Sequence, residues 1–112
     1  MKFLTLIISA RAYGVETLLE LAILDQLSRP ENLDFYSDKS TLTIAKLSIL
    51  LGDHLTPIAE SLAHLEAIGL VTSRRLFAGA GIRSLLIDLT PKGKKLMFGN
   101  RPVLRSKTIT RI

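Results

Sequence analysis

The sequence predicts a mainly α-helical α+β domain with one small β-hairpin, arranged as a winged helix-turn-helix. Residues 43–68 have the pattern of two helices joined by a short turn that contains glycine, which is typical of a helix-turn-helix. Residues 71–89 follow as two runs of strand-forming side chains around a tip of alternating alanine and glycine. Residues 90–98 then begin with threonine and proline, a combination that starts helices. Two helices, a hairpin and a helix in this order predict a wing beside a helix-turn-helix.

Length and composition indicate a single domain. The chain has 112 residues, of which 47% are hydrophobic, enough for a real core but not for a second domain. We expect the domain to span residues 1–98 and a basic tail to follow at 99–112. Because the chain has no cysteine, it has no disulfide framework, thiolate zinc site or cysteine nucleophile. This composition fits a reducing compartment, so we expect a cytoplasmic protein.

The N-terminal apolar run is short. Residues 3–8 make a run shorter than the roughly 7–15 residues of a secretory signal core, and Arg11 follows closely. The run is also too short to span a bilayer, which needs about 20 residues. We therefore expect no membrane segment, and secretion is the less favoured alternative.

The first helix is expected at about residues 9–28, because Pro30 pushes the residue before it out of the helical region. Its apolar side chains do not keep to one face: Leu18 lies on the main apolar face, and Ile23 and Leu24 extend the apolar surface. A helix of this kind usually contacts more than its own small domain. The sequence therefore predicts a homodimer.

The helix-turn-helix is predicted from its capping residues and its apolar spacing. Thr43 can cap the first helix, and Gly52 ends it. Thr56 and Pro57 then have the types expected for the cap and first position of a second helix. The buried stripe of this second helix has the spacing i, i+4, i+7 and consists of Ile58, Leu62 and Leu65.

Charge is distributed unevenly along the chain. Residues 1–73 have five Lys/Arg and nine Asp/Glu, a net charge of −4, whereas residues 74–112 have ten Lys/Arg and one Asp, a net charge of +9. The overall formal charge is +5. A basic C-terminal part favours an anionic partner such as nucleic acid, and the alternative is a solubilising tail.

Three segments resemble a known family. They are LTIAKL at 42–47, HLEAIGLV at 64–71 and LTPKG at 89–93, and together they resemble winged helix-turn-helix regulators of the MarR/PadR type over about residues 41–97. The resemblance implies a homodimeric transcriptional regulator that binds a pseudo-palindromic site on double-stranded DNA. It also implies that the helix at 56–68 is the recognition helix and that the wing contacts the flanking backbone or minor groove.

The candidate DNA-binding residues form three groups, on the recognition helix, on the wing and at the start of the last helix. They are Thr56, Pro57, Glu60, Ser61 and His64; Arg74, Arg75 and Arg83; and Lys92, Lys94 and Lys95. The outward helix face has no Arg, Lys, Asn or Gln, the side chains that best read guanine and adenine edges. Shape and backbone contacts are therefore expected to contribute. For the arginines and lysines, the alternative is an ordinary solvated surface.

The C-terminal tail combines charge with apolar side chains. Its cations could follow phosphates or the minor groove like a basic arm, and they are Arg101, Arg105, Lys107 and Arg111. Its apolar residues instead favour docking on a partner subunit, and they are Val103, Leu104, Ile109 and Ile112. Both readings stay open.

The sequence gives no support for catalysis or for a cofactor. His54 and His64 match no zinc-ligand spacing, and there is no nucleophile elbow, phosphate-binding glycine loop or paired-carboxylate cluster. We therefore expect no enzyme activity, no metal and no cofactor; no effector ligand has a visible signature. A second hypothesis is a winged-helix protein–protein interaction module in a transcription, replication or viral assembly, because the recognition face is neutral to acidic.

Overall fold

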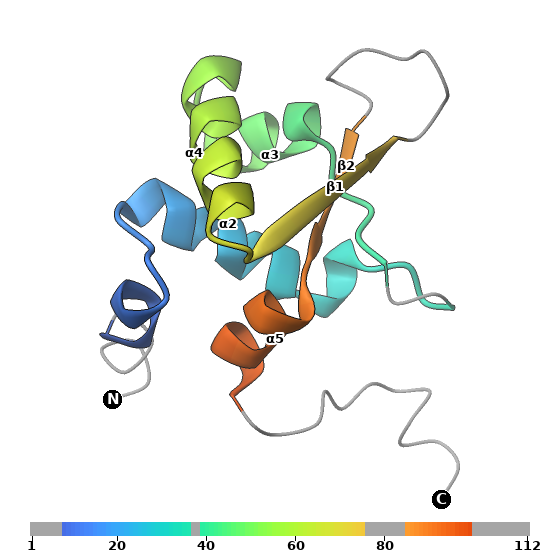
Figure 1. The fold of residues 1–112 in the computed structure, drawn as a ribbon. Helices are drawn as coiled ribbons and strands as arrows, with labels where there is room; N and C mark the ends of the chain where they lie inside the picture. The colour runs from blue at the N-terminus through green and yellow to red at the C-terminus, as the bar shows by residue number, and fades with distance from the viewer. Residues whose placement is uncertain (1–7, 37–38, 76–84, 100–112) are drawn as a thin grey trace, which may run out of the picture.

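The structure is a computed structural model, and it describes residues 8–36, 39–75 and 85–99. A helix at residues 8–12 comes first. The elements that follow are α2 (Leu18–Ser28), the 3-10 turn η1 (Pro30–Asn32), α3 (Ile44–Leu51), α4 (Leu55–Ala67), β1 (Val71–Arg75), β2 (Leu85–Leu89) and α5 (Pro91–Phe98) (Figure 1). This order confirms the predicted mainly helical fold with one small hairpin. The predicted hairpin tip, Arg83 and the tail from residue 100 lie outside the described residues.

The single first helix predicted at 9–28 is wrong, because the chain forms two helices there. Gly14 has φ +101, a left-handed backbone conformation that interrupts the helix after residues 8–12. Thr17 then starts α2 by accepting a hydrogen bond from the Glu20 backbone N–H over 3.1 Å. The apolar residues Ala10 and Val15 on either side of the break are buried, so the core continues where the helix does not.

The helix-turn-helix is confirmed, with one correction at the start of its second helix. Thr43 caps α3 as predicted, and α3 ends at Gly52. However, α4 begins at Leu55, and its N-cap is His54, which makes no side-chain capping bond. Thr56 is therefore in the first turn and is not the cap. Pro57 is the third helical residue, where the helix supplies no acceptor for an N–H and the proline costs little.

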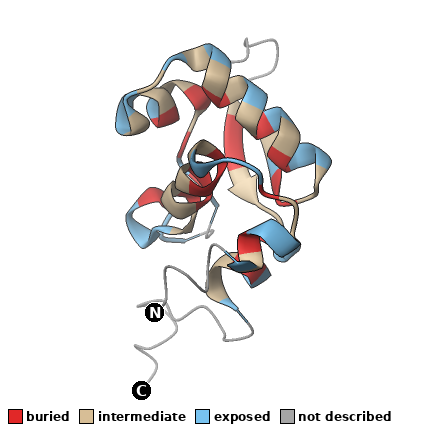
Figure 2. Ribbon diagram, turned by 90° about the vertical axis from the view of Figure 1, so that its left-hand side faces the viewer, coloured by how far each residue is buried: buried red, intermediate tan, exposed pale blue. Residues whose placement is uncertain are grey.

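The core lies between the helices and one face of the hairpin. Figure 2 places the buried residues on the inward faces of the elements. The predicted stripe of α4 is buried, since Ile58 and Leu65 are fully covered and Leu62 is 6% exposed. The α2 helix contributes three further fully buried side chains and contacts α3, α4, α5 and β2. The central position of α2 explains why it is apolar on more than one face.

The two strands form an antiparallel hairpin, with Val71 opposite Leu89 and Arg75 opposite Leu85. The hairpin is joined to the segment before α3, because the Ile87 N–H donates to the Leu42 carbonyl over 3.0 Å. Thr43 also makes an isolated bridge to β2. These bonds fix the orientation of the wing relative to the helix-turn-helix.

The arrangement in space separates two ends of the molecule. The start of α4 and the end of β1 lie in the upper part of Figure 1, whereas α5 and the helix at residues 8–12 lie in the lower part. Within the described residues, no helix is long and apolar enough to cross a membrane.

Candidate nucleic-acid interface

The exposed side of α4 consists of small and acidic side chains. Thr56, Glu60 and Ala63 are exposed, and Ala59 between them is half-buried. Their spacing of three or four residues places them on one side of the helix, opposite the buried stripe. We call these four residues the outer face of α4. Pro57 and Ser61 lie at its margins and are half-buried.

The N-terminus of α4 has no side-chain cap, and the carboxylate next to it, that of Asp53, accepts the His54 backbone N–H over 2.8 Å. The helices α2, α3 and α5 each begin with a threonine whose hydroxyl accepts a backbone N–H, but α4 has no side-chain cap. The first N–H groups of a helix have no acceptor within the helix, and the helix dipole places partial positive charge there. Backbone N–H groups at such an end are suited to a phosphate oxygen.

His64 does not point away from the domain, in contrast to the expectation from the sequence. Its Nδ1 lies 2.7 Å from Oε2 of Glu20 on α2, and its Nε2 lies 3.7 Å from Oε1 of Glu16. The Glu20 side chain is only 5% exposed, and its other oxygen accepts the Glu16 backbone N–H over 2.8 Å. His64 therefore connects α4 to α2 and is not part of the outer face.

Arg74 has partners within the domain. Its Nε donates to Oδ2 of Asp88 over 2.8 Å, and an Nη donates to the Ser40 carbonyl over 2.9 Å. Asp88 also accepts the Ser40 backbone N–H over 2.6 Å. This network attaches the hairpin to the segment before α3. Arg75 is the next residue of β1, but its side chain lies outside the described part of the structure, as does all of Arg83.

The three lysines near the start of α5 have different environments. Lys92 Nζ donates to the Ile68 carbonyl at the C-terminal end of α4 over 2.9 Å, and it lies 5.9 Å from the centre of the Tyr13 ring. A cation at a helix C-terminus complements the helix dipole. Lys94 and Lys95 are exposed. All three belong to α5, at the other end of the molecule from the start of α4 (Figure 1).

Lys46 is a further candidate, which was not among the residues predicted from the sequence. It is exposed on α3, the first helix of the helix-turn-helix, and it lies between the buried residues Ile44 and Leu47. In a helix-turn-helix the first helix crosses the DNA backbone. An outward position beside a buried stripe is the sequence signal that could have identified this residue.

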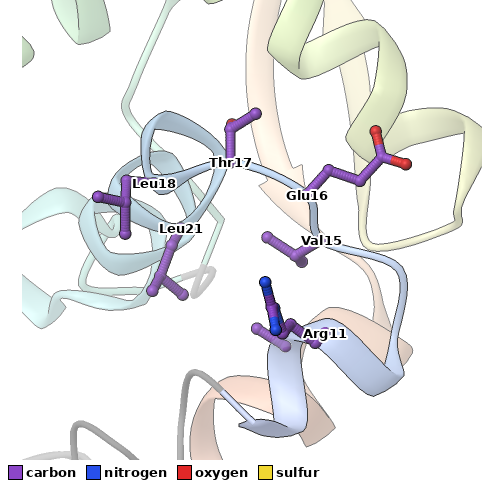
Figure 3. Close-up of a pocket in the computed structure, with 7 residues that line it drawn as sticks. Arg11, Val15, Glu16, Thr17, Leu18 and Leu21 are labelled. Atoms are coloured by element: carbon purple, nitrogen blue, oxygen red, sulfur yellow. The ribbon is translucent and has the colours of Figure 1, made fainter.

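A pocket of about 180 Å³ lies between the helix at residues 8–12 and the start of α2 (Figure 3). Arg11, Val15 and Leu21 line it, with the Glu16 carboxylate extending from its rim toward α4 (Figure 3). Leu18, also in its lining, is 74% exposed. No group of three His, Cys, Asp or Glu that could hold a metal ion occurs among the residues that the structure describes.

Solved structures share this architecture. The transcriptional regulator Tm0710 of Thermotoga maritima superimposes with a TM-score of 0.58 and 21% identity, over 86% of this chain and 61% of that one. The chain has a winged helix-turn-helix fold. A MepR variant from a multidrug-resistant S. aureus clinical isolate has a TM-score of 0.62 and 18% identity, over 92% of this winged helix and 67% of that chain. The ferric uptake regulator of Vibrio cholerae superimposes with a TM-score of 0.54 and 24% identity, over 74% of this chain and 60% of that one.

These likenesses concern the fold. The winged helix spans about three fifths to two thirds of the length of these three chains. Tm0710 is a transcriptional regulator, and the V. cholerae protein is a ferric uptake regulator with DNA-binding domains. The sequence matches no protein-family model and no curated protein.

Proposed function

We propose that this chain is a cytoplasmic, homodimeric transcriptional regulator that binds double-stranded DNA through its winged helix-turn-helix. The observation that carries the proposal is the position of α4. Three of its four outer-face residues are exposed, its N-terminus has no side-chain cap, and its start lies in the same upper part of the molecule as the end of β1 (Figure 1). Two structural neighbours, the transcriptional regulator Tm0710 and the ferric uptake regulator with its DNA-binding domains, support the same function.

In this proposal α3, α4 and the wing each contact a different part of the DNA. The α4 helix enters the major groove, its first N–H groups and Lys46 of α3 bind phosphates, and the wing contacts the flanking DNA through Arg75 and Arg83. The basic tail adds attraction that does not depend on sequence. The α5 lysines contribute to the overall field and not to the reading surface, because they lie at the other end of the molecule.

The dimer is proposed from exposed apolar side chains of the first two helices. Leu18, in the lining of the pocket between the first two helices, is 74% exposed, and Ile8 at the start of the first helix is 69% exposed. Burial of such residues against a second copy would remove apolar surface from water. A symmetric dimer would then place two copies of α4 in successive major grooves, about 34 Å apart.

The test is binding of the full chain to the DNA upstream of its own reading frame, titrated with salt and with unrelated competitor. We expect a complex that survives competitor. In a plot of the logarithm of the binding constant against the logarithm of the salt concentration, Lys46→Gln should make the slope less steep by about 0.9 for each phosphate that the variant no longer neutralises. Lys95→Gln is the matched control, because it removes the same charge at the other end of the molecule. A complex that disappears with competitor would contradict the proposal, and equal slopes for the two variants would show that Lys46 does not bind phosphate.

A second candidate function rests on a different observation. Two apolar side chains of α3 are exposed, with Ile49 at 80% and Leu50 at 44%, and α4 presents Glu60 and Glu66 to solvent without a basic side chain other than His64. These features suit a protein partner in a transcription, replication or viral assembly. Such a module would bind DNA only weakly and without preference for the upstream sequence, so the same competitor titration separates the two functions.

A further inference from the structure

The outer face of α4 restricts which bases the helix can recognise. Thr56, Ala59 and Ala63 present methyl groups, and Glu60 presents a carboxylate. From the first of these residues to the last, the face is about 10 Å long at 1.5 Å per residue, which is about three base-pair steps. This length of helix is the part that a recognition helix inserts into the groove.

The chemistry of this face matches pyrimidines. In the major groove, thymine presents a C5 methyl group, which packs against the methyl of alanine or threonine, and cytosine presents an N4 amino donor, which a carboxylate accepts. Guanine and adenine are best recognised by Arg, Lys, Asn or Gln, and α4 contains none of these types between Leu55 and Ala67. The short alanine side chains also allow the helix backbone to come close to the base edges.

The remaining polar groups of α4 do not add a preference for purines. His64, the one other side chain of the helix that could donate to a purine N7 from a ring nitrogen, is hydrogen-bonded to the buried carboxylate of Glu20. Ser61 is half-buried at the margin of the face. A hydroxyl can serve either a purine or a pyrimidine and does not decide between them.

We propose that the outer face of α4 reads pyrimidines: the methyl groups of Thr56, Ala59 and Ala63 contact thymine C5 methyls, and Glu60 accepts a hydrogen bond from a cytosine N4 amino group. This inference rests on the proposed function, since it specifies what the DNA-binding helix recognises. It makes the helix sensitive to groups that occur only in the major groove.

The experiment starts with selection of a binding site by the full-length protein from duplexes that contain a randomised segment. In the selected duplex, each thymine is then replaced by uracil, which removes only the C5 methyl. We expect binding to weaken about fourfold for each contacted methyl, at roughly 0.8 kcal/mol per buried carbon. Thymines outside the footprint of α4 serve as internal controls. Replacement of purines by their 7-deaza analogues, which removes the N7 acceptor, should leave binding unchanged at the positions that face α4.

Protein variants assign the contacts. Thr56→Ser keeps the hydroxyl and removes the methyl, so one thymine position should lose its sensitivity to uracil while the others keep theirs. Glu60→Gln replaces an acceptor for cytosine with a side chain that pairs with adenine. A repeated selection with this variant should therefore change one preferred base from cytosine to adenine, with a tenfold or larger change in relative affinity. Glu66→Gln, on the same helix but beyond the outer face, is the matched control and should select the original site.

The outcomes separate this inference from the proposed function. Sensitivity to uracil without sensitivity to 7-deazapurines supports the inference. The reverse pattern would overturn it and leave a sequence-specific regulator that reads purines. Selection that yields no preferred site would overturn both the inference and the proposed function.

Discussion

Gly93 is a residue whose missing side chain the fold requires. A β-carbon at this position would lie 2.2 Å from the Leu70 carbonyl oxygen and 3.2 Å from a side-chain carbon of Leu89. We expect Gly93→Ala to lower the free energy of unfolding by about 2 kcal/mol or more, toward the upper end of the range for overpacked cores. Chemical denaturation measures this. The neighbouring exposed residue provides the control, since Lys94→Ala should change stability by less than about 0.5 kcal/mol. Equal stabilities would show that α5 can move away from the chain at Leu70.

Glu20 connects α2 to α4 through its buried carboxylate. Its buried carboxylate accepts the Glu16 N–H and faces the imidazole of His64 on α4. Glu20→Ala would leave these groups without their partner, at a cost of about 1–3 kcal/mol. The control is Glu16→Ala, because the Glu16 side chain is 73% exposed and lies 3.7 Å from the imidazole. Thermal unfolding of the two variants should therefore differ clearly, and similar decreases in stability would argue against the contact between α2 and α4.

At the scale of the elements, the threonines before the helices have different roles. The hydroxyls of Thr43 and Thr90 accept backbone N–H groups at the starts of α3 and α5, whereas Thr56 lies inside the first turn of α4. Replacement of each by alanine should cost about 1 kcal/mol at Thr43 and Thr90, and well below that at Thr56. Denaturation of the three variants under one condition measures the difference. A large decrease in stability at Thr56 would mean that the helix starts there, with Thr56 as its cap.

The same elements explain how far the sequence predicts the fold. Thr43 is correctly predicted as a cap because it directly precedes a helix with clear apolar spacing, and Thr90 because it directly precedes Pro91, a residue suited to the first helical position. The prediction of one first helix fails because apolar residues continue across Gly14 into the turn and α2, so periodicity alone does not reveal the break. The pair formed by Thr17 and Glu20 three residues later is the signal for the new start.

The candidate site could be predicted less completely, because three of its residues have partners that only the fold brings near. His64 meets Glu20, 44 residues earlier in the chain, and Arg74 meets Asp88 from the opposite strand. Lys92 reaches the carbonyl of Ile68 at the end of α4. In a linear sequence all three have the types expected of DNA contacts. Their hydrogen bonds instead place them in the framework that orients α4 and the hairpin.

At the scale of the whole molecule, the charge asymmetry of the sequence does not coincide with one surface. The basic C-terminal part includes α5, which lies away from the start of α4 (Figure 1). Within the described part of the chain, Lys46 is the exposed lysine on the helix-turn-helix. The proposed attraction for DNA therefore depends on Lys46, on Arg75 and Arg83 of the wing, and on the tail. A count of charges along the chain overstates the contribution of α5.

The proposed dimer gives the last prediction. Leu18→Lys places a charge where apolar surface should meet a second copy, and the desolvation cost of that charge should separate the subunits. Sedimentation should then detect a monomer, and affinity for a two-fold site should fall by about 100-fold because the second half-site no longer binds within one complex. Ile49→Lys is the control, since it charges an equally exposed residue on α3. If Ile49→Lys instead gave the monomer, the interface would lie on the helix-turn-helix itself. The subunits would then cover the surface proposed for DNA, which would favour the interaction module over the regulator.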